Sequence, residues 1–324
     1  MNWVLLAIAA IVIADLAVRI FYVRLILPQF DAKPPFNVQR HPVDSLAEPA
    51  ALITRDGVLL RGAVHRAVDQ PARGVVLFFP ELDGDHWSAA NYCEGLLAAG
   101  FDVASFDFRG QGESDTPIGY TPNHWPTQHE LVDAASALQW VSEQPEWRDL
   151  PLGVFGISRG SVVGLVASAD CPQVQAYCGE GTYTVDRLLE HFALRWAQLY
   201  LPLWAFPYLP LWHLRVTLRL ARWTSEWRRH VRYAIVEKRF AALRRLPVLL
   251  IAGERDTYVN PTVTKSIVDA IGGRQSTLWE VPGAKHNQAR EAVGAQYDAR
   301  LVEFFSRMCP ASVGTEEAVL VAVK

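Results

Sequence analysis

Residues 152–169 read LGVFGISRGSVVGLVASA. A short apolar run leads to a serine with a glycine two positions before it and another two positions after it, and a stretch of small residues follows. The pattern predicts a buried strand over 152–156 and a helix over 160–169. The two glycines permit a tight turn that holds Ser158 at the tip of the strand, near the positive end of the helix. In this strand–turn–helix context, G-x-S-x-G predicts a nucleophilic serine.

Short apolar runs alternate with helical patterns on both sides of this motif. We expect strands over 51–54, 59–65, 74–79, 102–107, 152–156, 174–178, 248–252 and 277–281. We expect helices over 89–99, 129–143, 160–169, 261–271 and 288–307. Buried strands that alternate with helices predict an α/β fold, in which a mainly parallel sheet is covered by helices on both faces.

The composition is that of a folded protein with one large domain. Of the 324 residues 50% are hydrophobic and 20% are charged, which is typical of a folded chain and not of a disordered one. The net charge of −3 gives no reason to expect nucleic acid as a partner. The four cysteines are widely spaced, without a CxxC pair, and no metal or phosphate-binding motif occurs. We therefore expect no disulfide framework, no metal and no cofactor.

A nucleophilic serine needs a base, and the base needs an acid that orients it. Two later loops supply candidates, because Asp256 lies in GERDTYVNP after one predicted strand and His286 lies in PGAKHN after the next. The carboxyl ends of parallel strands meet at one edge of a sheet, and the order Ser, Asp, His suits this architecture. We predict a catalytic triad of Ser158, Asp256 and His286, with Glu180 as the competing acid.

Residues 50–307 resemble an α/β-hydrolase, and they are most similar to the lysophospholipase, monoglyceride lipase and S33 serine aminopeptidase group. Besides the predicted triad, DFRGQGESD at 107–115 resembles that group's D-x-R-G-x-G-x-S stretch. The resemblance implies a serine hydrolase that cleaves carboxylic esters through an acyl-enzyme. Lipid-like esters of the lysophospholipid or monoacylglycerol type are the expected substrates.

The loop after the third strand departs from the pattern of the resembled group. That group carries an H-G-x type motif there, which supplies one oxyanion N–H, whereas this sequence has Phe-Pro followed by Glu81. Pro80 has no N–H, so the expected oxyanion donors are the backbone N–H groups of Glu81 and Arg159. Glu81 and two nearby aspartates would also oppose a negatively charged intermediate.

Three further side chains are candidates for the site. Arg159 is unusual at the position after the nucleophile. Its side chain is expected to pair with an acid such as Glu81, to point to solvent, or to reach a phosphate or carboxylate of the substrate. Trp87 and Tyr183 are predicted as walls of the substrate pocket.

The N-terminus is apolar over residues 3–23, apart from Asp15 and Arg19, which stand one helical turn apart and can pair. Residues 1–27 are predicted to form an uncleaved membrane anchor, and 28–49 a proline-rich linker. Basic residues follow the apolar run, which places the catalytic domain in the cytoplasm. A helix that lies in the interface or packs on the domain, and a cleaved signal peptide, are the alternatives.

An insertion at 182–246 divides the predicted hydrolase domain of 50–309, which a tail of 310–324 follows. The insertion holds five Trp residues, and its 12 Lys or Arg residues outnumber 4 Asp or Glu. Its apolar segment 199–214 precedes an amphipathic cationic helix, expected over 214–232. This pattern predicts either a surface that meets anionic lipid or a helical cap over the substrate pocket.

Three functions remain open at this point. The first is a membrane-associated hydrolase of lipid-like carboxylic esters, with an acyl or lipid substrate and the membrane surface as its partners. The second uses the same triad on a thioester or amide, or for acyl transfer to an acceptor other than water, since the fold does not fix the function. The third is a non-catalytic membrane-associated binding protein. The oligomeric state is left open.

Overall fold

A single eight-stranded sheet forms the centre of the computed structural model, which describes residues 2–32, 38, 41–199, 202–208 and 210–309. The strand order is β1-β2-β4-β3-β5-β6-β7-β8. The β1–β2 and β2–β4 pairs are antiparallel and all the others are parallel. The strands are β1 Glu48–Ile53, β2 Leu59–His65, β3 Gly74–Phe79, β4 Phe101–Phe106, β5 Leu152–Ile157, β6 Val174–Glu180, β7 Val248–Gly253 and β8 Ser276–Val281. The predicted α/β fold is confirmed.

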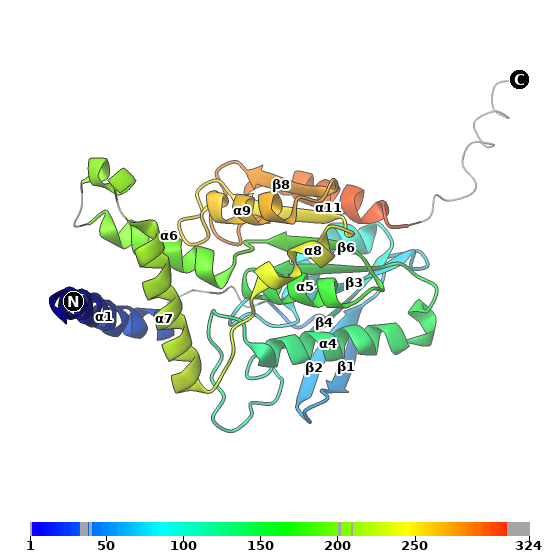
Figure 1. Cartoon of the computed structure of the whole chain (residues 1–324). Coiled ribbons are helices and arrows are strands. Elements are labelled where there is room, and N and C mark those ends of the chain that lie inside the picture. Colours follow the sequence, from blue (N-terminus) through cyan, green and yellow to red (C-terminus); the bar gives the residue numbers. More distant parts are fainter. Residues whose placement is uncertain (1, 33–37, 39–40, 200–201, 209, 310–324) are drawn as a thin grey trace, which may run out of the picture.

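Helices cover both faces of the sheet (Figure 1). Side chains of a strand alternate between faces, so in β3 Leu77 and Phe79 join one hydrophobic core while Val76 and Phe78 join the other. The first core is closed by α4 Gln128–Glu143, α5 Arg159–Asp170, α8 Phe240–Leu243 and α9 Pro261–Ile271. The second is closed by α2 Ser88–Tyr92, α3 Glu94–Ala98, α10 Ala289–Val293 and α11 Ala295–Ser306.

Two helices that the sequence predicts as continuous are each divided. The helix expected over 89–99 breaks at Cys93, whose backbone leaves the helical region with φ −110° and ψ 12°. The helix expected over 288–307 breaks at Gly294, which has φ +48°, a conformation that glycine adopts readily. Both breaks separate short helices that pack on the same face of the sheet.

Helix α1 (Asn2–Asp31) runs through Pro28 instead of ending before it. The last turn is retained because it packs on the domain. The ring of Phe30 stacks on Trp125 with 4.8 Å between centroids, and the Trp125 indole N–H donates to the Phe30 carbonyl at 2.8 Å. The predicted helix boundary at residue 27 is therefore wrong, and the linker is shorter than 28–49.

Within the described residues, one helix is long and apolar enough to cross a membrane, judged by length and composition alone. It is Trp3–Asp31, with a mean hydropathy of 2.5 over its most apolar window. Most of its large apolar side chains are exposed, from Trp3 to Leu25. The predicted pair of Asp15 and Arg19 is present, with 2.6 Å between carboxylate and guanidinium.

The insertion forms a helical cap at the same edge of the molecule as α1 (Figure 1). It consists of α6 Val185–Ala197, η2 Leu203–Tyr208, α7 Leu211–Arg229 and η3 Val236–Arg239, followed by α8. The cationic helix expected over 214–232 is α7, which begins and ends three residues earlier. It ends at Arg229 because the backbone of His230 is left-handed, with φ +54°. The apolar segment 199–214 is described only in part, since residues 200, 201 and 209 lie outside the described residues.

Candidate active site

Ser158 occupies a strained turn between β5 and α5. Its φ of +50° and ψ of −116° are unusual for a residue with a side chain, and its N–H donates to the Glu180 carbonyl at 2.8 Å. The flanking glycines make room for this turn. A Cβ atom on Gly156 would lie 2.6 Å from the Gly160 carbonyl oxygen, and one on Gly160 would lie 2.3 Å from the carbonyl oxygen of Phe79.

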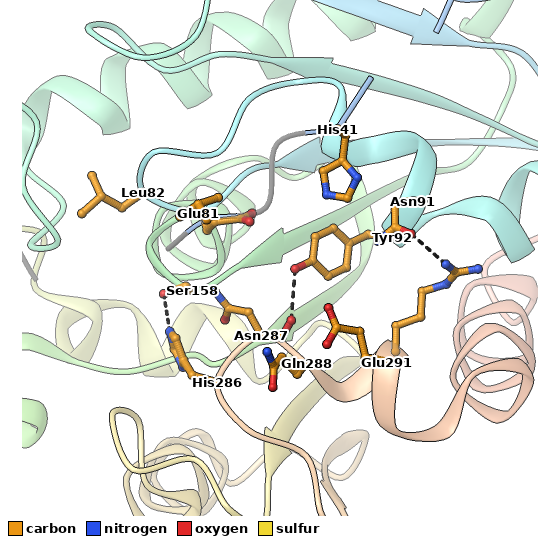
Figure 2. A pocket seen from close by; sticks show the side chains of 12 residues that line it. His41, Glu81, Leu82, Asn91, Tyr92, Ser158, His286, Asn287, Gln288 and Glu291 are labelled. Atoms are coloured by element: carbon orange, nitrogen blue, oxygen red, sulfur yellow. Dashed lines mark hydrogen bonds between the residues drawn. The ribbon is translucent and has the colours of Figure 1, made fainter. Parts of the chain in front are cut away.

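Three polar side chains from three loops form a continuous chain of contacts. Ser158 Oγ lies 3.0 Å from His286 Nε2, and His286 Nδ1 lies 2.6 Å from Asp256 Oδ2 (Figure 2 shows the first contact). The other carboxylate oxygen of Asp256 accepts the backbone N–H groups of Tyr258 and Val259, each at 2.8 Å. These loops follow β5, β7 and β8, so the structure brings together the three residues of the predicted triad.

The alternative acid, Glu180, has a different set of partners. Its Oε1 accepts the Ala289 N–H at 3.0 Å and its Oε2 accepts the Tyr297 hydroxyl at 2.8 Å. Burial raises the pKa of this carboxyl. Glu180 therefore ties the end of β6 to α10 and α11, whereas Asp256 holds Nδ1 of His286.

The loop after β3 packs against the first turn of α5. The carbonyl oxygens of Phe79 and Pro80 lie where a side chain on Gly160 would stand, so this approach depends on the glycine. Glu81, the next residue, lines the same pocket as Ser158. The backbones of Glu81 and Arg159 thus flank the nucleophile from two elements.

The side chain of Glu81 is buried in that pocket. Burial raises the pKa of its carboxyl to about 7, and the residue's own backbone N–H acts in the opposite direction. Its Oε2 has no hydrogen-bond partner among the described residues. The neighbouring Asp85 also has a raised pKa, chiefly through burial. The expected acidic cluster therefore contains a carboxyl that loses its proton close to neutral pH.

The Arg159 side chain pairs with an acid, which is one of the three expected positions, but the acid is not Glu81. It is 1% exposed and points away from solvent. Its guanidinium donates to the carbonyl of Asn123 at 3.0 Å, to Glu130 Oε1 at 3.3 Å and to Gln111 Oε1. The pairing with Glu81 is wrong, because a buried acid of α4 takes the guanidinium instead.

The two predicted pocket walls lie elsewhere. Tyr183 is fully buried, and its hydroxyl donates to the carbonyl of His124. Trp87 packs on the ring of His86 at 4.2 Å, and its indole N–H donates to Glu113 at 3.4 Å. Neither Trp87 nor Tyr183 is among the residues that line the two cavities described next.

A polar cavity of about 380 Å³ opens over Ser158 and His286 (Figure 2). Sequence reasoning missed most of its lining: His41, Asn91, Tyr92, Asn287, Gln288 and Glu291. Asn287 directly follows His286 in the sequence, but only the structure shows that it lines this cavity. Its Oδ1 is buried and has no hydrogen-bond partner among the described residues. His41 comes from the predicted linker, where no pattern marks it.

An apolar cavity of about 390 Å³ lies between the last turns of α1 and the cap. Its lining includes Ile26, Phe30, Leu189, Phe192, Ala193, Trp196 and Leu218. His124 and Tyr258 also line it, and the Tyr258 ring lies 5.1 Å from that of His286. Burial lowers the pKa of His124 to about 3, so this ring is neutral at physiological pH.

In the part of the chain that the structure describes, no three His, Cys, Asp or Glu side chains gather as a metal site. The four cysteines are all unpaired with one another.

Comparison with known proteins gives one family and a set of similar folds. A family model described as serine aminopeptidase, S33, matches residues 70–233. An esterase from Pyrococcus furiosus superposes with a TM-score of 0.63 at 19% identity, over 85% of this chain and 97% of that one. An esterase from an Arctic intertidal metagenomic library gives 0.55 at 16% identity, over 83% and 97%.

Two curated relatives match a shorter region. Both are described as putative phosphoribosyl transferases of Mycobacterium tuberculosis, and each is 29% identical over 134 residues. The match covers 40% of this chain and 29% of each relative, so the chain spans less than a third of their length.

Proposed function

Because this chain belongs to the serine aminopeptidase S33 family and is a serine hydrolase of the α/β-hydrolase superfamily, we propose that it cleaves carboxylic esters of lipid-like acids at a membrane surface. The observation that carries the proposal is the chain of contacts from Ser158 through His286 to Asp256. In this assignment Ser158 is the nucleophile, His286 the general base and Asp256 the acid that orients it.

The reaction is acyl transfer in two steps. His286 Nε2 takes the Ser158 proton while Oγ forms a bond to the carbonyl carbon, and the oxyanion is held by the N–H groups of Glu81 and Arg159. Collapse of this intermediate breaks the ester bond, and His286 returns the proton to the leaving alcohol. A water molecule then gives a proton to His286 while its oxygen bonds to the acyl carbon. Collapse of this second intermediate breaks the bond from the acyl carbon to Oγ, and His286 passes the proton to Oγ, which releases the acid and free Ser158. Asp256 keeps the Nδ1 proton of His286 in place throughout.

The apolar cavity supports an acyl chain as the larger part of the substrate. It is lined mostly by aliphatic and aromatic side chains, and one of them, Tyr258, has its ring 5.1 Å from that of His286. Apolar cavities with a polar group at one end are typical of sites for long hydrophobic ligands. An acyl chain that passes Tyr258 would bring its carbonyl to Ser158.

The polar cavity supports an alcohol part with hydrogen-bond donors. Glu81 Oε2 and Asn287 Oδ1 are buried acceptors without partners among the described residues. Buried acceptors are costly when left unpaired, so hydroxyl groups on the leaving alcohol would compensate them.

Attachment to a membrane is supported by two exposed surfaces at one edge of the molecule. The first is α1, whose apolar side chains are mostly exposed. The second is the cap, where Trp212, Trp223 and Trp227 are exposed beside arginines of α7. Aromatic and basic side chains together favour the interface of an anionic membrane.

One observation favours a second candidate, cleavage of an amide next to an ammonium group. Two carboxyls, Glu81 and Glu291, line the polar cavity, and an ammonium group there would pair with them. A substrate comparison separates the candidates, because the ester proposal predicts activity on neutral fatty esters.

The test is covalent labelling with a fluorophosphonate in detergent, followed by hydrolysis of p-nitrophenyl acetate and dodecanoate, a dodecanoyl thioester and an aminoacyl p-nitroanilide. We expect labelling of the wild type, none of Ser158→Ala, and full labelling of Ser45→Ala, an exposed serine. Dodecanoate should be the better ester. Folded wild-type protein without labelling would overturn the hydrolytic assignment, and a preference for the anilide would favour the second candidate.

A further inference from the structure

The second half of α1 is held by polar contacts with α7, beside which it lies (Figure 1). The Asp15 carboxylate lies 2.7 Å from Nε2 of His213, and the Arg19 guanidinium donates to the Thr217 hydroxyl at 3.3 Å. At the end of the helix the Asp31 carboxylate accepts a hydrogen bond from a serine of α7. This half of α1 therefore has a defined place against the cap.

The last turns of α1 form one wall of the apolar cavity. The lining residues from this segment are Ile26, Gln29, Phe30 and Ala32. Ile26 and Phe30 stand about one helical turn apart, so they share one side of the helix. Phe30 is held there by its stacking on Trp125. The cavity thus keeps its shape only while α1 stays in this place.

Most of the remaining lining comes from the cap. Helix α6 contributes five residues, Leu189, Phe192, Ala193, Arg195 and Trp196. The buried part of the lining includes His124 and Trp125. The exposed part comes from both segments and consists of Gln29, Ala32, Arg195 and Trp196. The cavity therefore opens between the end of α1 and the end of α6.

One lining residue lies beside the triad. Tyr258 belongs to the loop that carries the acid of the triad, and its ring is 5.1 Å from that of His286. Arg195, at the opening of the cavity, donates to the carbonyl of Thr257 at 2.6 Å and so holds α6 to the same loop. An acyl chain attached to Ser158 can therefore pass Tyr258 and reach the wall formed by α1.

We propose that the end of α1 is part of the substrate site, where Ile26 and Phe30 contact the acyl chain and select its length. The inference rests on the ester hydrolysis proposed above, and it gives a second task to the helix that is proposed to attach the chain to a membrane. Residues 50–309 carry most of the sheet and the whole triad, but without α1 they would lack one wall of the acyl site. The preference for long acyl chains then depends on α1 in detergent solution too, where no bilayer is present.

The first experiment maps the acyl chain in the wild-type full chain, purified in detergent. A dodecyl fluorophosphonate that carries a diazirine at the end of its chain is attached to Ser158, where Oγ bonds to phosphorus and fluoride leaves. Irradiation then crosslinks the chain end to the side chains around it, and mass spectrometry of the peptides identifies them. A butyl fluorophosphonate with the same diazirine is the length control.

We expect the dodecyl probe to crosslink within residues 26–32 and the butyl probe to leave these residues unmodified. Dodecyl crosslinks that leave 26–32 unmodified, for example in Tyr92 or Gln288 of the polar cavity, would overturn the inference. Equal crosslinking of 26–32 by both probes would overturn it as well, because the contact would not depend on chain length. Folded protein that reacts with neither probe would instead overturn the hydrolytic assignment.

A matched pair of substitutions on α1 tests the same contact by kinetics. Ile26→Trp places an indole in the cavity, so the ratio of kcat/KM for p-nitrophenyl dodecanoate to that for the acetate should fall about tenfold. Ile20→Trp makes the same change at a 47% exposed position outside the lining of the cavity, and it should keep the wild-type ratio. An unchanged ratio in Ile26→Trp, or an equal fall in both variants, would overturn the inference.

Discussion

The edge of the sheet that carries Ser158, Asp256 and His286 differs from the edge formed by α1 and the cap in how its residues are held. At the catalytic edge each side chain follows a strand of the parallel part of the sheet and is fixed by part-buried hydrogen bonds. At the cap edge two helices meet through a few polar pairs and leave large apolar side chains exposed. Substitutions at the first edge should therefore change the chemistry, and those at the second should change which substrate and which surface the protein meets.

The largest expected effect comes from removing the charge of Asp256. Asp256→Asn keeps the shape but stabilises the wrong tautomer of His286, so kcat for a p-nitrophenyl ester should fall about 10⁴-fold. Glu254→Gln, an exposed carboxyl in the same loop, is the control and should stay within about twofold of wild type. Equal losses in both variants would mean that the loop, and not the contact with His286, matters.

A bulky residue in the apolar cavity should separate long from short substrates. Ala193→Trp fills space between α6 and the last turns of α1, so kcat/KM for p-nitrophenyl dodecanoate should fall about tenfold while that for the acetate stays unchanged. Gln198→Trp, exposed just past the end of α6, controls for the added indole. If both esters are slowed equally, the cavity does not hold the acyl chain.

The pH dependence should show the titration of Glu81. Its pKa of about 7 means that the carboxyl is neutral below this pH and ionised above it. The ionised group repels the oxyanion and competes for its own N–H, so wild-type kcat should fall several-fold, by about 3 to 10, between about pH 6 and pH 8.5. Glu81→Gln should lose this fall, and Glu291→Gln, which lines the same cavity, should keep it.

The pH dependence of stability is a second test of the raised pKa of Glu81. The folded state raises the pKa of Glu81 from 4.5 to about 7, so it binds the proton more tightly than the unfolded chain does. The contribution of this group to the free energy of unfolding therefore falls as the pH rises from about 4.5 to 7, and stays low above that. Thermal melts of wild type and Glu81→Gln should converge at low pH and diverge at high pH in favour of the variant.

The smallest effect is expected on the outer face of α7. Arg219→Gln removes one exposed charge, so binding to vesicles with phosphatidylglycerol should weaken about fivefold, while binding to pure phosphatidylcholine should not change. Lys265→Gln, an exposed charge on α9, is the control. An equal loss in both variants would show a general effect of net charge and would remove α7 from the lipid-binding surface.

The same contrast explains how much the sequence could predict. Local rules select Ser158, because the glycines and the flanking strand and helix all lie within a few residues of it. The order of the three residues along the chain, and the edge at which parallel strands end, then select His286 and Asp256. In the structure His286 Nε2 lies 3.0 Å from Ser158 Oγ, and Asp256 Oδ2 lies 2.6 Å from His286 Nδ1. Each of these predictions needs only residues adjacent to a strand.

The rest depends on contacts between distant segments. The guanidinium of Arg159 donates to Glu130 on another helix, and the spacing of the two residues in the sequence does not predict that pair. His41 reaches the polar cavity from a segment without regular structure. Proline predicts the end of a helix at Pro28, but the packing of Phe30 on Trp125 outweighs that local preference.

The buried side chain of Arg159 has a mechanical consequence. Its guanidinium holds Glu130, whose other oxygen accepts from Thr127 at 2.7 Å, and Thr127 forms a β-bridge with Tyr233 just after α7. These four residues, linked through two side chains and a backbone bridge, thus join the rear of the catalytic turn to the base of the cap. Any tilting of the cap about this base would pull on the residue that presents the oxyanion N–H.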